Sequence, residues 1–318
     1  MPPEPPVAEP VPDVVDEAPV AVAEPTVVIP AEPKPPESKR LRSVAIVLTG
    51  RQPAYENVAN ELAKHIDNYS TFDLSDKREP PVTTFRRIND ADYRAVIAIG
   101  LRAAQSAVAM SRAPVVFCQV FNLQDYELLT DATRGIAALP PLGLNMAAWK
   151  SIDPALQRVG AIIGTGHDEL ISEARMAAEK HGVDLYVRVS QSDQETQYIF
   201  KRMVREIDGF WLFPDNRILS PRVLEQMLAD AKQNRVRVAV FSESMLAMGG
   251  SISASTVDSD IAETIVGVLR KIEAGNIASV PAVSPLTEVR IVSNDALLNY
   301  LLPTAASVPR LNASTVKQ

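Results

Sequence analysis

Short runs rich in Val, Ile and Ala alternate along most of this chain with segments of helical period. Examples are SVAIVLTG before ENVANELAKHI, YRAVIAIG before LRAAQSAVAM, and DGFWLF before SPRVLEQMLADAKQN. Apolar runs that are bounded by turns and followed by helices of about 10–15 residues indicate βαβ units. Strands that are apolar on both sides belong to parallel sheets covered on both faces. The sequence therefore predicts an α/β fold.

This rhythm occurs twice, over residues 41–125 and 156–241, and predicts two Rossmann-like lobes with a cleft between them. The expected divisions are a Pro/Ala/Glu-rich spacer over 1–40, a first lobe over 41–138 plus 250–292, a second lobe over 139–249, and a C-terminal helix and tail over 293–318. Because the chain would return to the first lobe, we expect several crossings that form a multi-strand hinge.

Helix boundaries are marked by residues suited to them. Ser220-Pro221 and Asp153-Pro154 are each expected to start a helix, because Pro suits the first helical turn. Gly182 and Gly275 follow helical segments and are expected to be left-handed C-terminal caps.

The N-terminal tract is rich in Pro and acids. Residues 1–38 hold about half of the prolines, which predicts a disordered, extended segment that serves as a semi-rigid spacer or has no role. Residues 1–36 account for most of the net charge of −7, so the remainder is near neutral and has no basic stripe for nucleic acid. As written, the N-terminus is no signal peptide; either the protein is cytosolic or an export segment was removed.

Signals for catalysis and metals are weak. The single cysteine, Cys118, lies in an apolar run and is expected to be a buried thiol. The three histidines lack metal-ligand spacing, and neither a G-x-S-x-G elbow nor a Walker A loop occurs. No run approaches the roughly 18 apolar residues that span a bilayer. We therefore expect a chain without enzymatic activity, cofactor, metal or transmembrane segment.

Polar residues gather where the predicted strands end. Ligands of open parallel sheets bind beyond the carboxyl ends of the strands, near helix N-termini. The candidate ligand-binding residues at these positions are Thr49, Gly50, Gln52, Gly100, Gln119, Thr165, Asp215, Asn216, Ser242 and Glu243, with Asn122, Gly164, Gly166, Ser190 and Gln191 as further strand-end positions. Such hydroxyls, amides and glycine N–H groups suit a small polar solute. Asp215 has two interpretations, a helix cap or an acceptor for a ligand amine.

One segment resembles a known family. DGFWLFPDNRILSPRVLEQMLADAKQNRVRVAVFSESMLAMGGSIS is similar to the second-lobe core of bacterial ABC-transporter substrate-binding proteins of the type I periplasmic fold, in the tryptophan/tyrosine-binding-like branch. The later VGVLRKIEAG and VRIVSND also match, and the resemblance covers about residues 41–302. It implies a two-lobed ligand trap that closes by hinge motion, with Thr49, Gln119, Asp215 and Ser242 at cleft-facing positions.

The function expected from these observations is solute binding without catalysis. The resemblance implies capture of a small polar molecule, such as an amino acid, for an ABC permease, by a protein that is periplasmic or anchored on the periplasmic side of the envelope. The alternative is an envelope scaffold or regulatory protein that uses the same fold to bind a protein partner without a solute. The long spacer favours this alternative.

Overall fold

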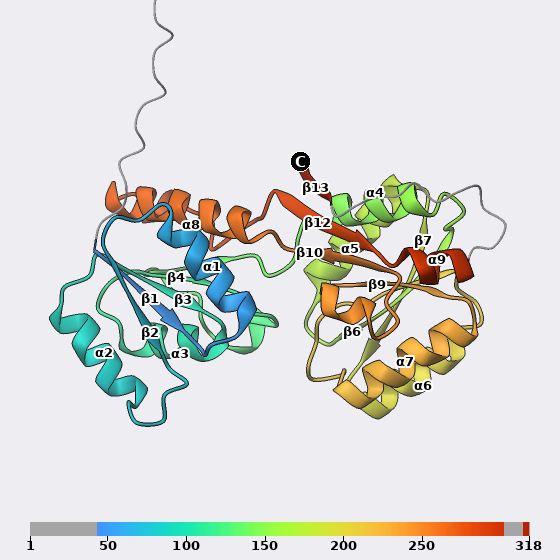
Figure 1. Ribbon diagram of the computed structural model, residues 1–318, viewed down its shortest axis with the longest axis horizontal. Helices are drawn as coiled ribbons and strands as arrows, with labels where there is room; N and C mark the ends of the chain where they lie inside the picture. The colour runs from blue at the N-terminus through green and yellow to red at the C-terminus, as the bar shows by residue number, and fades with distance from the viewer. Residues whose placement is uncertain (1–42, 302–313, 318) are drawn as a thin grey trace, which may run out of the picture. The chain divides into compact units, whose positions relative to one another are not determined.

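The computed structural model describes residues 43–301 and 314–317. The Pro-rich spacer expected over 1–40 and most of the tail after residue 301 lie outside the described residues. The described chain forms two α/β lobes, as expected from its alternating pattern (Figure 1).

The first lobe is built on a six-stranded sheet with the order β11-β5-β4-β3-β1-β2. All of its strand pairs are parallel. The central strands are fully buried, as their unbroken apolar runs predict. The strands are β1 (Val44–Leu48), β2 (Tyr69–Asp73), β3 (Ala95–Ile99), β4 (Val115–Cys118), β5 (Thr133–Ile136) and β11 (Val283–Ser284).

Helices cover both faces of this sheet. Alternate side chains of β1 face opposite ways, so Ile46 packs with α1 and α8 while Val47 packs with α2 and α3. Figure 1 shows α8 and α1 together in this lobe. The helices are α1 (Pro53–Ala63), α2 (Pro81–Asp90), α3 (Leu101–Met110) and α8 (Asp258–Glu273), and a short 3-10 helix, η1 (Leu123–Asp125), follows β4.

The second lobe is built on a seven-stranded sheet with the order β13-β12-β10-β9-β8-β6-β7. The strands from β7 to β10 pair in parallel, whereas β12 pairs antiparallel with β10 and with β13. The strands are β6 (Arg158–Gly164), β7 (Asp184–Ser190), β8 (Gly209–Trp211), β9 (Arg237–Val240), β10 (Ile252–Ser255), β12 (Glu288–Ser293) and β13 (Ser314–Lys317).

Two groups of helices cover the second sheet. Trp149 of α4 packs on one face with residues of α5 and α9, and Phe200 of α6 packs on the other face with residues of α7. These helices are α4 (Leu142–Ile152), α5 (Asp168–Lys180), α6 (Asp193–Met203), α7 (Pro221–Gln233) and α9 (Asp295–Leu301). The 3-10 helices are η2 (Glu243–Leu246) after β9 and η3 (Ile277–Ser279) after α8.

The chain crosses between the lobes three times, after β5, after β10 and after β11. Here the structure corrects one expected division. Only α8, η3 and β11 of residues 250–292 return to the first lobe; β10 and most of β12 belong to the second sheet. The reason is strand pairing: β10 pairs with β9, and β12 then pairs with β10.

Most helix punctuation behaves as predicted, with one exception. Ser220 caps α7 ahead of Pro221, and Gly182 and Gly275 have φ values of 65° and 71°. The prediction that a helix starts at Asp153-Pro154 is wrong, because α4 ends there, at Ile152. The Asp153 carboxylate instead accepts a hydrogen bond from Nε of buried Arg237, at 2.8 Å.

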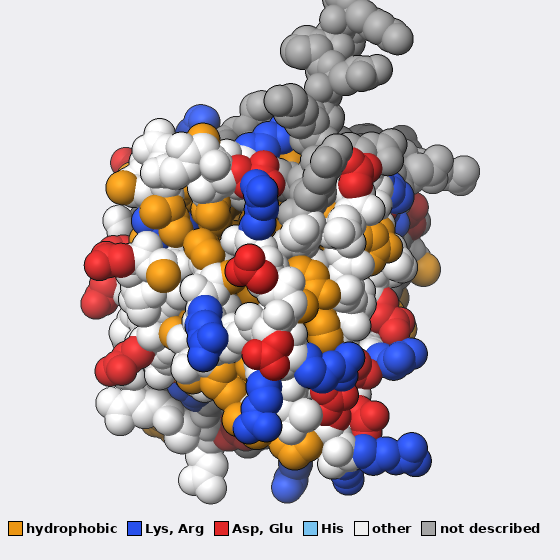
Figure 2. Space-filling view, turned by 90° about the vertical axis from the view of Figure 1, so that its left-hand side faces the viewer, with side chains coloured by type: hydrophobic (Ala, Val, Ile, Leu, Met, Phe, Trp, Pro, Cys, Tyr) orange, Lys and Arg blue, Asp and Glu red, His pale blue; other side chains and the backbone are white. Residues whose placement is uncertain are grey.

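Charges on the first lobe are mixed in sign. Figure 2, which views Figure 1 from its left-hand side, shows Lys and Arg interspersed with Asp and Glu. In this lobe Arg51 pairs with Asp73 at 3.0 Å, and Arg87 pairs with Glu79 at 2.8 Å. The visible described surface has no field of one sign that would attract a nucleic-acid backbone. No helix within the described ranges is long and apolar enough to cross a membrane.

Candidate functional site

A cavity of about 770 Å³ lies between the two lobes. The first lobe contributes one face of α1, the start of α8 and the loop after β4. The second lobe contributes the loop after β9 and one residue of β12, and two crossings close the sides. The residues that line it are Pro53, Ala54, Asn57, Glu61, Gln119, Phe121, Ala138, Leu139, Pro140, Phe241, Ser242, Glu243, Ser255, Thr256, Val257, Asp258, Ser259 and Arg290. This volume suits a small molecule.

Two phenylalanines from opposite lobes meet at this cavity. Phe121 follows β4, Phe241 follows β9, and their ring centroids are 6.3 Å apart with the planes inclined by 56°. This separation lies in the range of favourable aromatic pairs. Phe121 remains 38% exposed, so a ligand in the cavity could contact it.

The loop after β4 turns sharply to reach the cavity. Gln119 and Asn122 both have left-handed backbone conformations, with φ values of 58° and 52°. Such conformations are uncommon outside glycine, although asparagine tolerates them, and they are concentrated at binding sites. The two turns place Gln119 and Phe121 on the cavity wall while Asn122 contacts the second lobe.

The charged groups of the cavity are mostly acidic. Arg290 forms an ion pair with Glu243, whereas Asp258 at the start of α8 forms a hydrogen bond with the Asn57 side chain. Burial raises the pKa of Asp258 and the nearby charge of Glu61 raises it further, and these effects outweigh the lowering by the Asn57 hydrogen bond and the charge of Arg290. The ionised form of Asp258 is thus poorly compensated.

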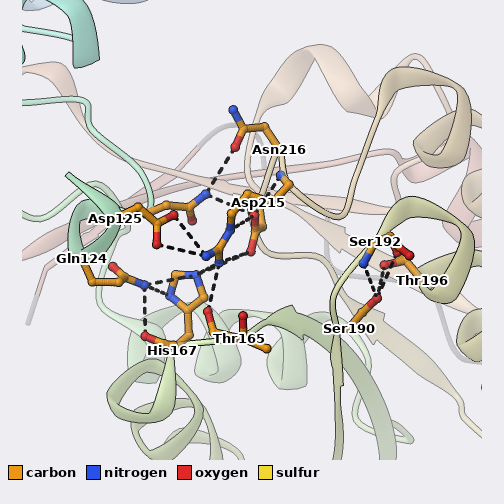
Figure 3. A network of polar contacts seen from close by, with 12 residues as sticks. Gln124, Asp125, Thr165, His167, Ser190, Ser192, Thr196, Asp215 and Asn216 are labelled. Atoms are coloured by element: carbon orange, nitrogen blue, oxygen red, sulfur yellow. Dashed lines mark hydrogen bonds and ion pairs between the residues drawn. The ribbon is translucent and has the colours of Figure 1, made fainter.

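A network of ion pairs joins the lobes next to this cavity (Figure 3). At its centre is Arg217, which donates from Nη2 to Oδ2 of Asp215 at 2.7 Å and from Nη1 to Oδ1 of Asp125 at 3.1 Å. Asp215 follows β8 in the second lobe, and Asp125 ends η1 in the first. The guanidinium group therefore bridges two carboxylates across the lobe boundary.

Three further side chains extend the network. Asn122 Nδ2 donates to Oδ1 of Asp215 at 3.1 Å, and Gln124 Nε2 donates to the carbonyl oxygen of Gly166 at 3.2 Å. His167 lies against Gln124, and its Nε2 is 2.6 Å from Nη2 of Arg217. A second interlobe cavity, of about 340 Å³, lies beside Asn122, Gln124 and His167.

The network shifts the pKa values of its members. Burial lowers the pKa of His167, and the Arg217 charge lowers it further. Burial alone would raise the pKa of Asp215, but the hydrogen bonds and charge of Arg217 reverse this, and the net pKa is lowered. His167 is therefore kept neutral beside an ionised Asp215.

Three of the ten candidate ligand-binding residues line the large cavity: Gln119, Ser242 and Glu243. Gln52 precedes the cavity-lining Pro53 as the N-cap of α1. Thr49 and Gly100 lie together at the start of α3, where Thr49 Oγ1 accepts from Ala103 N at 3.0 Å.

Gly100 fits there because it lacks a side chain. Its φ is 87°, and a Cβ would lie 2.6 Å from Thr49 Oγ1. Gly50 is buried beside Ser75.

The remaining three candidates belong to the ion network and not to the wall of the large cavity. The Thr165 carbonyl accepts from Arg217, and Asn216 Oδ1 accepts from Asn122. Asp215, for which a helix cap and an acceptor for a ligand amine were both left open, is only 5% exposed, and both of its oxygens accept hydrogen bonds from Arg217. Ser190 lies apart, bonded to Thr196 and Ser192 (Figure 3).

Sequence reasoning missed most of the cavity wall. Phe121 and Phe241 were hidden in apolar runs, where a buried strand position is the usual interpretation. Asn57 and Glu61 are spaced i, i+4 on one face of α1, and this spacing was the available signal. Asp258 lies at a crossing whose course depends on the assembled lobes.

The described residues contain no cluster of metal ligands, and their one thiol is buried. No group of three or more His, Cys, Asp or Glu side chains there could hold a metal ion. Cys118 is buried as expected, and burial raises the pKa of its thiol to about 12. A thiol with that pKa is a poor nucleophile at neutral pH.

Two α/β lobes, three crossings and an interlobe cavity define the architecture of type I periplasmic binding proteins. A family model described as ABC transporter substrate binding protein matches residues 55–300, and the chain belongs to this family. No curated protein matches the chain in sequence.

Several solved structures share the fold. A ligand-free, open substrate binding protein with adhesive properties from Clostridium difficile has a TM-score of 0.64 and 15% identity, covering 87% of this chain and 99% of that one. An ABC domain in complex with L-Trp from Streptococcus pneumonia has a TM-score of 0.56 and 17% identity, with 82% and 94% covered. A conserved domain protein from Vibrio cholerae has a TM-score of 0.54 and 19% identity, with 86% and 97% covered.

Proposed function

We propose that this protein captures a small polar solute, such as an amino acid, between its lobes and presents it to an ABC-type permease on the periplasmic side of the membrane. The observation that carries the proposal is the cavity of about 770 Å³, whose wall is shared by both lobes and two crossings. A solute that contacts both lobes favours the closed arrangement, because only that arrangement offers it all of its contacts. The role is binding and not catalysis.

The proposed contacts fall into two groups. Gln119, Ser242 and Glu243 contact the solute directly, since they line the cavity together with Phe121 and Phe241. The other candidates support the site: Thr49, Gly50, Gln52 and Gly100 shape the starts of α1 and α3, and Thr165, Asp215 and Asn216 hold the ion network.

A thermal-shift screen of the purified protein against amino acids, amines, nucleosides, sugars and small carboxylates tests the proposal. A solute at about 100 times its dissociation constant adds roughly 2.7 kcal/mol to the folded state, which raises the melting temperature measurably. Isothermal titration of each hit then gives its affinity.

Variants locate the site. Gln119→Asn shortens a side-chain amide on the cavity wall, and asparagine tolerates the left-handed backbone conformation of this position. We expect the affinity for the solute to fall about tenfold, which corresponds to about 1.4 kcal/mol. Gln191→Asn is the matched control, because Gln191 is exposed after β7 and does not line the cavity. Equal affinities in the two variants would place the solute elsewhere.

The alternative function, binding of a protein partner, has one observation in its favour. A groove of about 580 Å³ on the second lobe is lined by Tyr186, Arg188, Tyr198 and Arg202, and Tyr198 is 61% exposed. Tyrosine and arginine are enriched in protein interfaces. This function would be favoured if the solute screen gave no hit and if cross-linking in cells joined the protein to a protein partner. The cross-link should then be lost in Tyr198→Ala.

A further inference from the structure

The charges around the large cavity do not balance. Among the described residues that line it, the carboxylates are Glu61, Glu243 and Asp258, and the single cation is Arg290. Arg290 is already paired with Glu243. Glu61 and Asp258 are therefore left without an ion-pair partner on the cavity wall.

Glu61 and Asp258 differ in their partners and in their burial. Glu61 pairs with Lys64 at 2.7 Å, but Lys64 is 64% exposed, lies outside the cavity lining and forms a solvent-screened pair. Asp258 is half-buried, and its hydrogen bond comes from the neutral amide of Asn57. Burial is the main cause of its raised pKa, and the charge of Glu61 adds to it, while Asn57 and the more distant charge of Arg290 offset the shift only in part. Asp258 is the group that gains most from a bound positive charge.

The aromatic pair offers a matching surface. Phe121 and Phe241 line the same cavity, and neither phenyl ring carries a hydrogen-bonding group. The face of a phenyl ring attracts cations and packs against apolar groups. The site thus combines a carboxylate with apolar rings that tolerate positive charge.

We propose that the cleft selects an organic cation, an amine with an aromatic or alkyl body, over zwitterionic amino acids and organic anions. Asp258 holds the ammonium group, and Phe121 and Phe241 contact the body of the solute. A ligand carboxylate would have to take Arg290 away from Glu243. This proposal rests on the proposed solute-binding function and narrows its solute class.

Calorimetric titration of the full chain with matched probes tests the charge preference. Tryptamine, L-tryptophan and indole-3-acetate share a ring and carry a positive, a balanced and a negative charge, and phenethylamine, L-phenylalanine and phenylacetate repeat the series. We expect each amine to bind at least about tenfold more tightly than its zwitterion. A zwitterion or anion that binds as tightly as its amine overturns the cation proposal but leaves solute binding intact.

The cation proposal is also overturned if none of the six probes binds measurably in the calorimetric titration. The solute-binding function then stands or falls separately, according to whether the wider thermal-shift screen gives a hit.

Two variants separate the roles of the charges. Asp258→Asn should reduce amine affinity about tenfold or more. Its matched control is Asp168→Asn, because Asp168 holds the first position of α5 as Asp258 holds that of α8, but is exposed and does not line the cavity. Arg290→Gln frees Glu243 and should tighten amine binding. Retained amine affinity in Asp258→Asn, or loss of it in Arg290→Gln, contradicts the proposal.

Discussion

Asp215 shows how the partners of one residue decide its role. It lies in the loop after the buried strand β8, where an acceptor for a ligand amine would lie, but Arg217 is two residues further on and donates to both of its oxygens. Asn122, from the other lobe, donates to the same carboxylate. With its hydrogen-bonding capacity used within the protein, Asp215 stabilises the contact between the lobes.

His167 makes this contact sensitive to pH. Its pKa is lowered in the folded chain, mainly by burial and then by Arg217, although Asp215 and Asp125 oppose the shift. The folded protein therefore binds this proton less readily than the unfolded chain, whose histidines titrate near pH ~6.5. Stability from His167 is present above that pH and is lost as the pH falls through it. Asp215 stays ionised in this range because its own pKa is lowered.

We expect the melting temperature of the native protein to fall more than that of His167→Gln between about pH 7.5 and about pH 5.5. Parallel curves for the two proteins, measured by circular dichroism, would show that His167 does not govern this loss. His181→Gln is a control for loss of a histidine, because it changes the C-cap of the same helix, α5.

At the scale of elements, the short strand β8 depends on a glycine. Gly209 pairs in parallel with β6 and β9, and the fully buried Trp149 of α4 lies against it. A Cβ at this position would come within 2.7 Å of Trp149 Cζ2 and Leu156 Cδ1. The glycine therefore lets α4 pack closely on the sheet, and through α4 it positions the first crossing.

Gly209→Ala should lower the free energy of unfolding by about 1–3 kcal/mol through overpacking. Gly267→Ala should instead raise it by about 0.5–1 kcal/mol, because Gly267 lies inside α8 and a Cβ added there would meet open space. Urea denaturation of both variants measures the difference. Equal effects of the two substitutions would contradict the packing argument.

At the scale of the whole described molecule, the lobes are joined by three crossings and by side-chain contacts that differ in strength. The crossings are covalent and permit hinge motion. The contacts of Asn122, Gln124 and Asp125 with the second lobe are polar, and the aromatic pair of Phe121 and Phe241 adds about 0.5–1.5 kcal/mol. Closure thus depends largely on the single loop after β4.

Asn122→Asp should weaken this closure, because it places a second carboxylate 3.1 Å from Oδ1 of Asp215. We expect a larger radius of gyration by small-angle X-ray scattering. The double variant Asn122→Asp/Asp215→Asn exchanges the amide and the carboxylate, and should recover a compact particle. An unchanged radius in the single variant would mean that the network does not control the lobe arrangement.

Local periodicity was sufficient to predict much of this protein. The alternation of apolar runs and amphipathic segments indicated two parallel α/β lobes, and the motifs after residue 208 resembled the substrate-binding family, to which the chain belongs. Ser220, Gly182 and Gly275 marked their helix ends, since capping depends on neighbouring backbone groups.

Only the tertiary structure determined that β10 and β12 pair within the second sheet. It also determined which polar side chains form contacts with one another. Strand pairing and ion pairs join residues far apart in the chain, such as Asn122 with Asp215, and no local pattern encodes them. The same holds for the cavity, where Asp258 and Phe121 come together only when both lobes and the crossings are in place. The sequence by itself determined the class of fold, because its causes are local; the composition of the site followed from contacts across the lobes.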